Sequence, residues 1–73
     1  MATSRKLEER SKRVIMLATG VSYSEAAERL VAAGGSVKRA IVMTLAGADK
    51  PSTDAALEAS GGFARAALER LRR

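Results

Sequence analysis

Apolar residues recur along this chain at the three- and four-residue spacings that are typical of α-helices. Between residues 4 and 18, one helical face carries Leu7, Ser11, Val14, Ile15 and Ala18. A second run, from about residue 23 to residue 33, is expected to bury Ala26, Ala27, Leu30 and Val31. No segment shows the period-two alternation of a half-buried strand, so the pattern predicts an all-α fold.

Three more short helices complete the predicted bundle of about five. The third is expected over residues 37–46, where Val37, Ala40, Ile41 and Leu45 share a face. Pro51 disfavours helix at the residue before it, so the fourth helix is expected to begin after a cap at Ser52 or Thr53 and to run to about residue 60. The last is expected over residues 63–71.

Polar caps and glycines indicate where these helices begin and end. Gly20 suits the left-handed position that commonly ends a helix. Ser22 and Glu25 have the spacing of a capping box, in which each side chain accepts a hydrogen bond from an amide of the first turn. Ser36 is a good N-cap for the third helix. These four residues therefore predict two helix starts and one helix end.

Two glycine pairs, Gly34-Gly35 and Gly61-Gly62, lie in similar surroundings at an offset of 27 residues. The repeated unit is a helix, a Gly-Gly corner and a helix. We expect the first glycine of each pair to adopt positive φ and the second to let two helices approach closely. Phe63 follows the second pair at a helix start, where a core position is expected. A phosphate cradle at "GGSVKR" is the alternative, but it follows a helix and lacks the Walker spacing.

Composition narrows the possible functions. Seventy-three residues make a single domain, and the absence of cysteine and histidine removes the usual metal ligands and the usual general base. No convergent catalytic groups stand out, so we predict no catalytic residue, no metal and no cofactor. No apolar run approaches the roughly 20 residues that span a bilayer, and no signal peptide is evident, which predicts a cytoplasmic protein without a membrane partner.

The net charge of +5 favours an anionic partner. Nucleic acid is disfavoured, because Tyr23 and Phe63 are the only aromatic residues that could stack on bases. A small nucleic-acid-binding bundle is therefore the weakest of the functional alternatives.

The ordered set of residues resembles a known family. "KLEERSKRVIMLATGVSYSEAAERLVAAGGSVKRAIVMTLAG", followed by "ALEASGGFARAAL", resembles the C-terminal helical domain of bacterial N-acetylmuramic acid 6-phosphate etherases, to which glucokinase regulatory proteins are also similar. The resemblance implies that residues 1–47 form a ubiquitin-associated-like three-helix bundle and that residues 48–73 add a helical hairpin. Thr19-Gly20-Val21 stands where ubiquitin-binding members carry Met-Gly-Phe or Met-Gly-Tyr, which argues against ubiquitin recognition.

The resemblance also implies that this chain is the C-terminal part of a larger enzyme. Such an enzyme carries an N-terminal sugar-isomerase-type α/β domain and cleaves the lactyl ether of N-acetylmuramic acid 6-phosphate during cell-wall recycling, giving N-acetylglucosamine 6-phosphate and lactate. The helical domain alone would not be catalytic. Its expected role is to pack on the α/β domain or on a second subunit and to close over the sugar phosphate. The alternative is a free-standing protein-binding adaptor.

Lys6, Arg10 and Arg13 recur at positions that share one face of the first helix. The resemblance implies that Lys6, together with Arg10, helps to neutralise the substrate phosphate in the larger enzyme. A basic face exposed to water is the simpler interpretation of the same row.

Overall fold

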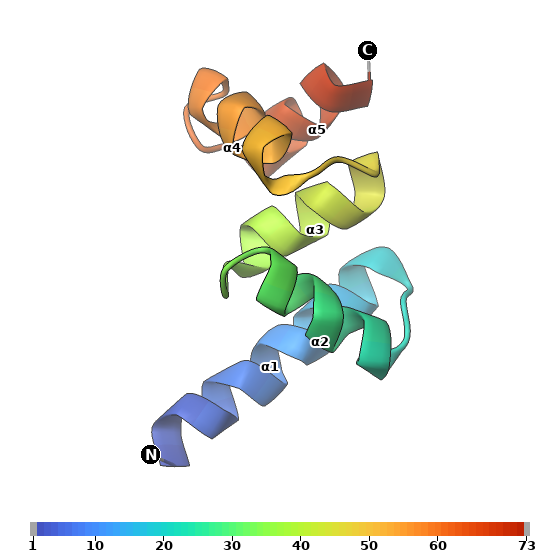
Figure 1. The fold of residues 1–73 in the computed structure, drawn as a ribbon, viewed down its shortest axis with the longest axis vertical. Helices are drawn as coiled ribbons and strands as arrows, with labels where there is room; N and C mark the ends of the chain where they lie inside the picture. The colour runs from blue at the N-terminus through green and yellow to red at the C-terminus, as the bar shows by residue number, and fades with distance from the viewer. Residues whose placement is uncertain (1, 73) are drawn as a thin grey trace.

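The protein consists of five helices joined by short corners (Figure 1). The structure is a computed structural model that describes residues 2–72, with the side chains of residues 2–5 left aside. The helices are α1 (Ala2–Thr19), α2 (Tyr23–Ala32), α3 (Val37–Ala46), α4 (Lys50–Ala59) and α5 (Ala64–Arg72). No strand occurs in residues 2–72, so the predicted all-α class and the five helices are confirmed. None of these helices has the length and apolar character that a membrane span requires.

The start of α4 differs from the sequence prediction. Asp49, rather than Ser52 or Thr53, is the N-cap, and its carboxylate accepts a hydrogen bond of 2.8 Å from the amide of Ser52. Pro51 lies in the first turn of the helix, where its missing N–H has no helical partner to lose. The helix therefore includes Lys50, which the prediction excluded. Other boundaries shift by one or two residues, and α5 begins at Ala64 rather than at Phe63.

Both glycines of each pair have positive φ. The angles are 68° and 88° at Gly34 and Gly35, and 65° and 85° at Gly61 and Gly62. The expectation that the second glycine permits a close approach is wrong, because a Cβ built on Gly35 would meet no atom within 4 Å. The second glycine is needed for its backbone conformation, which side-chain-bearing residues adopt only at a cost of about 1 kcal/mol or more.

The offset of 27 residues relates helices and hydrogen bonds of the fold as well as the two glycine corners. Gly35 donates to the carbonyl of Leu30 at 2.9 Å, and Gly62 donates to the carbonyl of Leu57 at 2.8 Å. Residues 23–32 of α2 correspond to residues 50–59 of α4, and Gly47 after α3 corresponds to Gly20 after α1. The fold is therefore two overlapping three-helix units: a first unit of α1, α2 and α3, and a second unit of α3, α4 and α5.

Each unit has its own buried cluster. The first cluster contains Ile15, Ala26, Leu30, Ala33 and Ala40, and the second contains Val42, Ala56 and Ala67. Ile15 and Val42 are counterparts at the offset of 27, as are Ala40 and Ala67. In Figure 1 the units stack along the long axis, with α3 between the α1–α2 pair and the α4–α5 pair. A subdivision of the chain at residue 47 stays a prediction, because α3 contributes to both clusters.

Several apolar residues that the sequence placed in the core are exposed. Val31 is 80% exposed, Phe63 73% and Leu7 61%, and Val14 is also exposed. Small residues form most of the two clusters, so the helices pack closely around them and leave larger apolar side chains outside. Phe63 lies at a corner with its ring beside Gly61, where a Cβ on the glycine would be 3.8 Å from the ring.

Thr53 is a buried polar residue in the second unit, at a position where the first unit has an alanine. Thr53 is fully buried, and among the described residues its hydroxyl has no hydrogen-bond partner, whereas its counterpart in the first unit is Ala26. We expect Thr53→Val to raise the free energy of unfolding by about 1 kcal/mol, since it removes an unsatisfied buried group at nearly constant volume. Urea denaturation followed by circular dichroism would measure the change.

Thr44→Val is the matched control. The Thr44 hydroxyl donates to the carbonyl of Ala40 at 2.7 Å, so its removal is expected to bring no gain in stability. An equal gain for both variants would show that the missing hydrogen bond at Thr53 is not the cause.

Candidate functional site

An open groove between α1 and α2 is the best-formed concave feature found among the described residues. Its volume is about 470 Å³, and its lining residues are Leu7, Glu8, Ser11, Lys12, Ala27, Leu30, Val31, Gly34 and Gly35. The groove exists because α1 begins early. The first residue of α3, Val37, corresponds to Arg10, so residues 2–9 add about two turns that have no counterpart in the second unit. Leu7 and Glu8 of these turns form the wall facing α2 together with Ser11 and Lys12 of the next turn.

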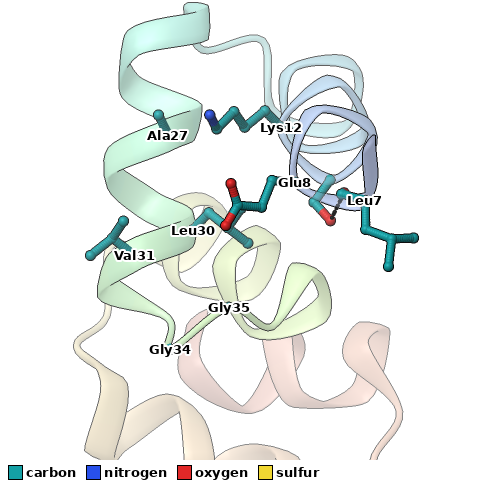
Figure 2. Close-up of a pocket in the computed structure, with 9 residues that line it drawn as sticks. Leu7, Glu8, Lys12, Ala27, Leu30, Val31, Gly34 and Gly35 are labelled. Atoms are coloured by element: carbon teal, nitrogen blue, oxygen red, sulfur yellow. Dashed lines mark hydrogen bonds between the residues drawn. The ribbon is translucent and has the colours of Figure 1, made fainter. Parts of the chain in front are cut away.

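The two charged side chains of the groove reach from α1 toward α2. Figure 2 shows Glu8 directed toward Leu30 and Lys12 directed toward Ala27, whereas Leu7 and Val31 point away from the space between the helices. The groove is therefore apolar along α2 and bears one charge of each sign along α1.

A hydrogen-bonded cluster beside the groove joins α1 to the start of α2. The Tyr23 hydroxyl lies 2.7 and 2.8 Å from the two carboxylate oxygens of Glu9, and Lys12 Nζ lies 3.4 Å from that hydroxyl and 5.2 Å from the ring centre. The hydrogen bond from Tyr23 is the main cause that lowers the pKa of Glu9, and Tyr23 likewise raises the pKa of Lys12. These contacts hold α1 against the start of α2 beside the groove.

The predicted phosphate-contacting residues lie on α1 outside the groove. Lys6 and Arg10 are both exposed, and neither lines the cavity. They are four residues apart on one helix, so their side chains project from successive turns of the same face. No carboxylate forms an ion pair with either of them among the described side chains. The structure thus presents two neighbouring cations to solvent.

The two cations of "GGSVKR", Lys38 and Arg39, donate hydrogen bonds to backbone carbonyls at or beside the glycine corners. Lys38 Nζ donates to the carbonyl of Gly62 at 2.7 Å, and so links one Gly-Gly corner to the other. Arg39 Nη1 donates to the carbonyl of Ala33, at the end of α2, at 2.7 Å. Both side chains are bound to backbone carbonyls rather than directed at a common anion site, which favours the corner interpretation over a phosphate cradle.

Arg39 also forms an ion pair with Asp54, which Lys50 joins at 3.2 Å. Burial of the Asp54 carboxyl opposes ionisation, but the hydrogen bonds from Arg39 and Lys50 outweigh it, so the pKa of Asp54 is lowered. This network joins α3 to α4. In the first unit, Lys12 corresponds to Arg39 and Ala27 corresponds to Asp54. Lys12 therefore has no carboxylate opposite it on α2, and both residues line the open groove.

The sequence-predicted caps have the following geometry. The Ser22 hydroxyl accepts a hydrogen bond from the amide of Glu25 at 3.2 Å, and the Ser36 hydroxyl accepts one from the amide of Arg39 at 3.2 Å. The return hydrogen bond that a full capping box requires, from the amide of Ser22 to the Glu25 carboxylate, does not occur among the described residues. Gly20 has a φ of 81°. Within residues 2–72, no group of three or more acidic residues is placed to hold a metal ion.

Three curated proteins similar to this chain carry the same name. N-acetylmuramic acid 6-phosphate etherases from Streptomyces avermitilis and Halalkalibacterium halodurans are each 45% identical over 67 and 69 residues, and the etherase from Geobacillus thermodenitrificans is 46% identical over 68 residues. The matches cover 92 to 94% of this chain. The chain is homologous to a segment of these etherases.

The homologous segment is a small part of each etherase. The chain spans about a fifth of the length of these relatives, at 22 to 23%. The resemblance stated from the sequence is therefore confirmed, together with the expectation that the family's proteins extend well beyond this segment. No family model matches the chain. No solved structure matches it either.

Neither the groove nor the cluster of Glu9, Lys12 and Tyr23 was predicted from the sequence. The cluster joins residues 11 to 14 positions apart, on different helices, and no spacing within one helix indicates such a contact. A signal for the groove was available in the repeat, because Ala27 and Val31 stand where the second unit has Asp54 and Glu58. That comparison would have indicated an apolar outer face on α2.

Proposed function

We propose that this chain is an accessory helical domain of a longer N-acetylmuramic acid 6-phosphate etherase, and that it packs on the part of that protein which contains the reaction centre. The observation that carries the proposal is the extent of the match, which spans nearly the whole chain but only about a fifth of each etherase. The longer protein would act as a lyase that cleaves the lactyl ether of the sugar phosphate.

The composition of the segment supports an accessory role. Chemistry on a sugar phosphate needs acid and base groups that converge in a pocket. The groove offers Glu8, Lys12 and the Ser11 hydroxyl, but that hydroxyl donates to the carbonyl of Leu7 at 2.8 Å, and the wall on α2 is apolar. Such a groove is better suited to packing against another domain or a second subunit of the longer protein than to catalysis.

Exchange of segments tests the proposal. The matching residues of the Streptomyces avermitilis etherase would be replaced by this chain, and turnover of N-acetylmuramic acid 6-phosphate would be compared with that of the parent and of a protein lacking the segment. We expect the exchanged protein to retain activity and the truncated protein to lose it. An exchanged protein that folds, as judged by circular dichroism, but has no activity would refute the assignment.

We further propose that Lys6, assisted by Arg10, contributes to binding of the substrate phosphate in the longer protein. Both side chains are exposed and have no ion-pair partner among the described side chains, so both are available to an anion. A hydrogen bond to a charged group contributes about 1.5 to 3 kcal/mol. Lys6→Ala in the exchanged etherase is therefore expected to raise KM by at least about tenfold.

Arg65→Ala is the matched control for the charge at position 6. Arg65 is an exposed cation on α5, at the other end of the molecule, and its loss is expected to leave KM unchanged. If Lys6→Ala left KM and kcat at the values of the exchanged etherase, Lys6 would have no role in phosphate binding, and the row would be a water-exposed basic face.

A further inference from the structure

The internal repeat allows one face of α1 to be compared with the corresponding face of α3. Val37, Ala40 and Ile41 of α3 pack against the cluster of the first unit. At the offset of 27 residues, their counterparts on α1 are Arg10, Arg13 and Val14, and Leu17 lies one turn beyond Val14. We call these four residues the outer stripe of α1. It is the face that a preceding pair of helices would cover if the repeat continued toward the N-terminus.

The outer stripe is uncovered in this structure. Leu17 is 83% exposed, Val14 is 40% exposed, and both arginines are exposed. The opposite end of the molecule is different. Val42, which faces the second unit, has Glu69 as its counterpart on α5, and Glu69 is exposed. Repeat proteins usually have polar residues on the outer faces of their terminal units. The α5 end follows this rule, whereas the α1 end combines two arginines with the exposed apolar side chains of Val14 and Leu17.

The charges on the stripe indicate the chemistry of its partner. Val37 and Ala40, which pack against apolar residues, are replaced by Arg10 and Arg13. A second copy of this chain, paired through the same face, would bring these cations against each other, and like charges in contact disfavour association. A partner with carboxylates would be attracted instead. The leucine and the valine require that it also present apolar side chains.

We propose that the outer stripe of α1 binds an amphipathic helix of another polypeptide segment, with its apolar side chains against Val14 and Leu17 and its carboxylates opposite Arg10 and Arg13. The equivalent face of α3 is covered by helices, which is why the occupant is a helix rather than an extended strand. Arg10 borders Lys6 on one side and Val14 on the other, so Arg13 and Leu17 distinguish this surface from the proposed phosphate contact. The inference does not require that the chain belong to an etherase.

A designed peptide provides the probe. It would be an amphipathic helix with leucine at every third and fourth position and glutamate on both flanks, and a second peptide would carry lysine in place of glutamate. We expect the glutamate peptide to shift the amide NMR signals of the ¹⁵N-labelled 73-residue chain around Val14 and Leu17, and the lysine peptide to have no effect. Shifts confined to the groove residues Glu8 and Ala27, or no shifts with either peptide, would overturn the proposal.

Two exposed apolar residues give matched variants. Leu17→Ser is expected to weaken binding of the glutamate peptide by about tenfold or more, since the side chain is buried on binding. Val31→Ser, at an 80% exposed position on α2, is expected to leave it unchanged. Equal effects of the two variants would show non-specific attraction to a basic protein.

Two further measurements cover the other possible occupants. Sedimentation velocity of the isolated chain is expected to show a monomer, and a dimer that Leu17→Ser dissociates would replace the proposed helix by a second copy. Co-sedimentation with vesicles of phosphatidylserine and phosphatidylcholine is expected to show no binding at physiological salt. Vesicle binding that Leu17→Ser abolishes would overturn the proposal in favour of a membrane surface.

Discussion

Ile15→Ala is expected to lower the free energy of unfolding by about 2 to 5 kcal/mol, which is the usual cost of removing a large aliphatic side chain from a packed core. Ile15 is the largest fully buried side chain of the first cluster, whose other members are three alanines and one leucine. The three alanines cannot extend into the space, because alanine has no side-chain torsion to change. Urea denaturation followed by circular dichroism at 222 nm would measure the loss.

The expected loss is a large part of the total stability. Single domains are stable by about 5 to 15 kcal/mol, and short chains lie toward the lower limit. Leu17→Ala is the matched control, because Leu17 lies on the same helix, two residues away, and is 83% exposed. Its effect is expected to remain within about 0.5 kcal/mol. Equal losses for the two variants would mean that α1 does not use its Ile15 face to pack on α2 and α3.

The helices were predictable because their limits are set by local chemistry. Ser36 begins α3 with a hydrogen bond to an amide three residues away, and Gly47 ends that helix with a φ of 64°. Such contacts lie within a few residues, and the sequence displays them directly. Asp49 was missed, although an acidic residue two positions before a proline is a recognisable helix start. The error came from giving weight to the effect of Pro51 on the residue before it.

Burial was predicted less well, because it depends on which helix lies opposite. α1 has apolar residues on two faces, with Ile15 on one and Leu17 on the other, and periodicity alone gives no reason to prefer either. In the structure the Ile15 face is buried, because α2 and α3 approach it where Ala26, Ala33 and Ala40 allow close contact. Phe63 was expected in the core because it follows a glycine pair at a helix start, but its side chain is 73% exposed.

The candidate site was predicted only in part. Lys6 and Arg10 lie on one face of a helix and are exposed, and this follows from spacing and charge alone. The groove required knowledge of the tertiary fold, since it arises where residues 2–9 of α1 extend beyond the part that repeats in α3. Residues of similar helical pattern can therefore differ in role, because one lies in a repeated part of the fold and another in an extension of it.

The internal repeat leads to the second large expected effect, at the helix that the two units share. Ala40 is fully buried in the first cluster, and α3 also supplies Val42 to the second. Ala40→Leu adds three carbon atoms where the packing leaves no room, so α3 must move away from α1 and α2. We expect a loss of about 1 to 3 kcal/mol or more in the free energy of unfolding, measured by urea denaturation.

The shared helix also predicts how the loss is distributed. Because α3 belongs to both units, its displacement by Ala40→Leu should weaken hydrogen-exchange protection in α4 and α5 as well as in α2. Ala59→Leu, at an exposed position near the end of α4, is the control and is expected to change stability by less than about 0.5 kcal/mol. If protection fell only in α1 and α2 while α4 and α5 kept theirs, the two units would be energetically independent, and α3 would not transmit strain between their clusters.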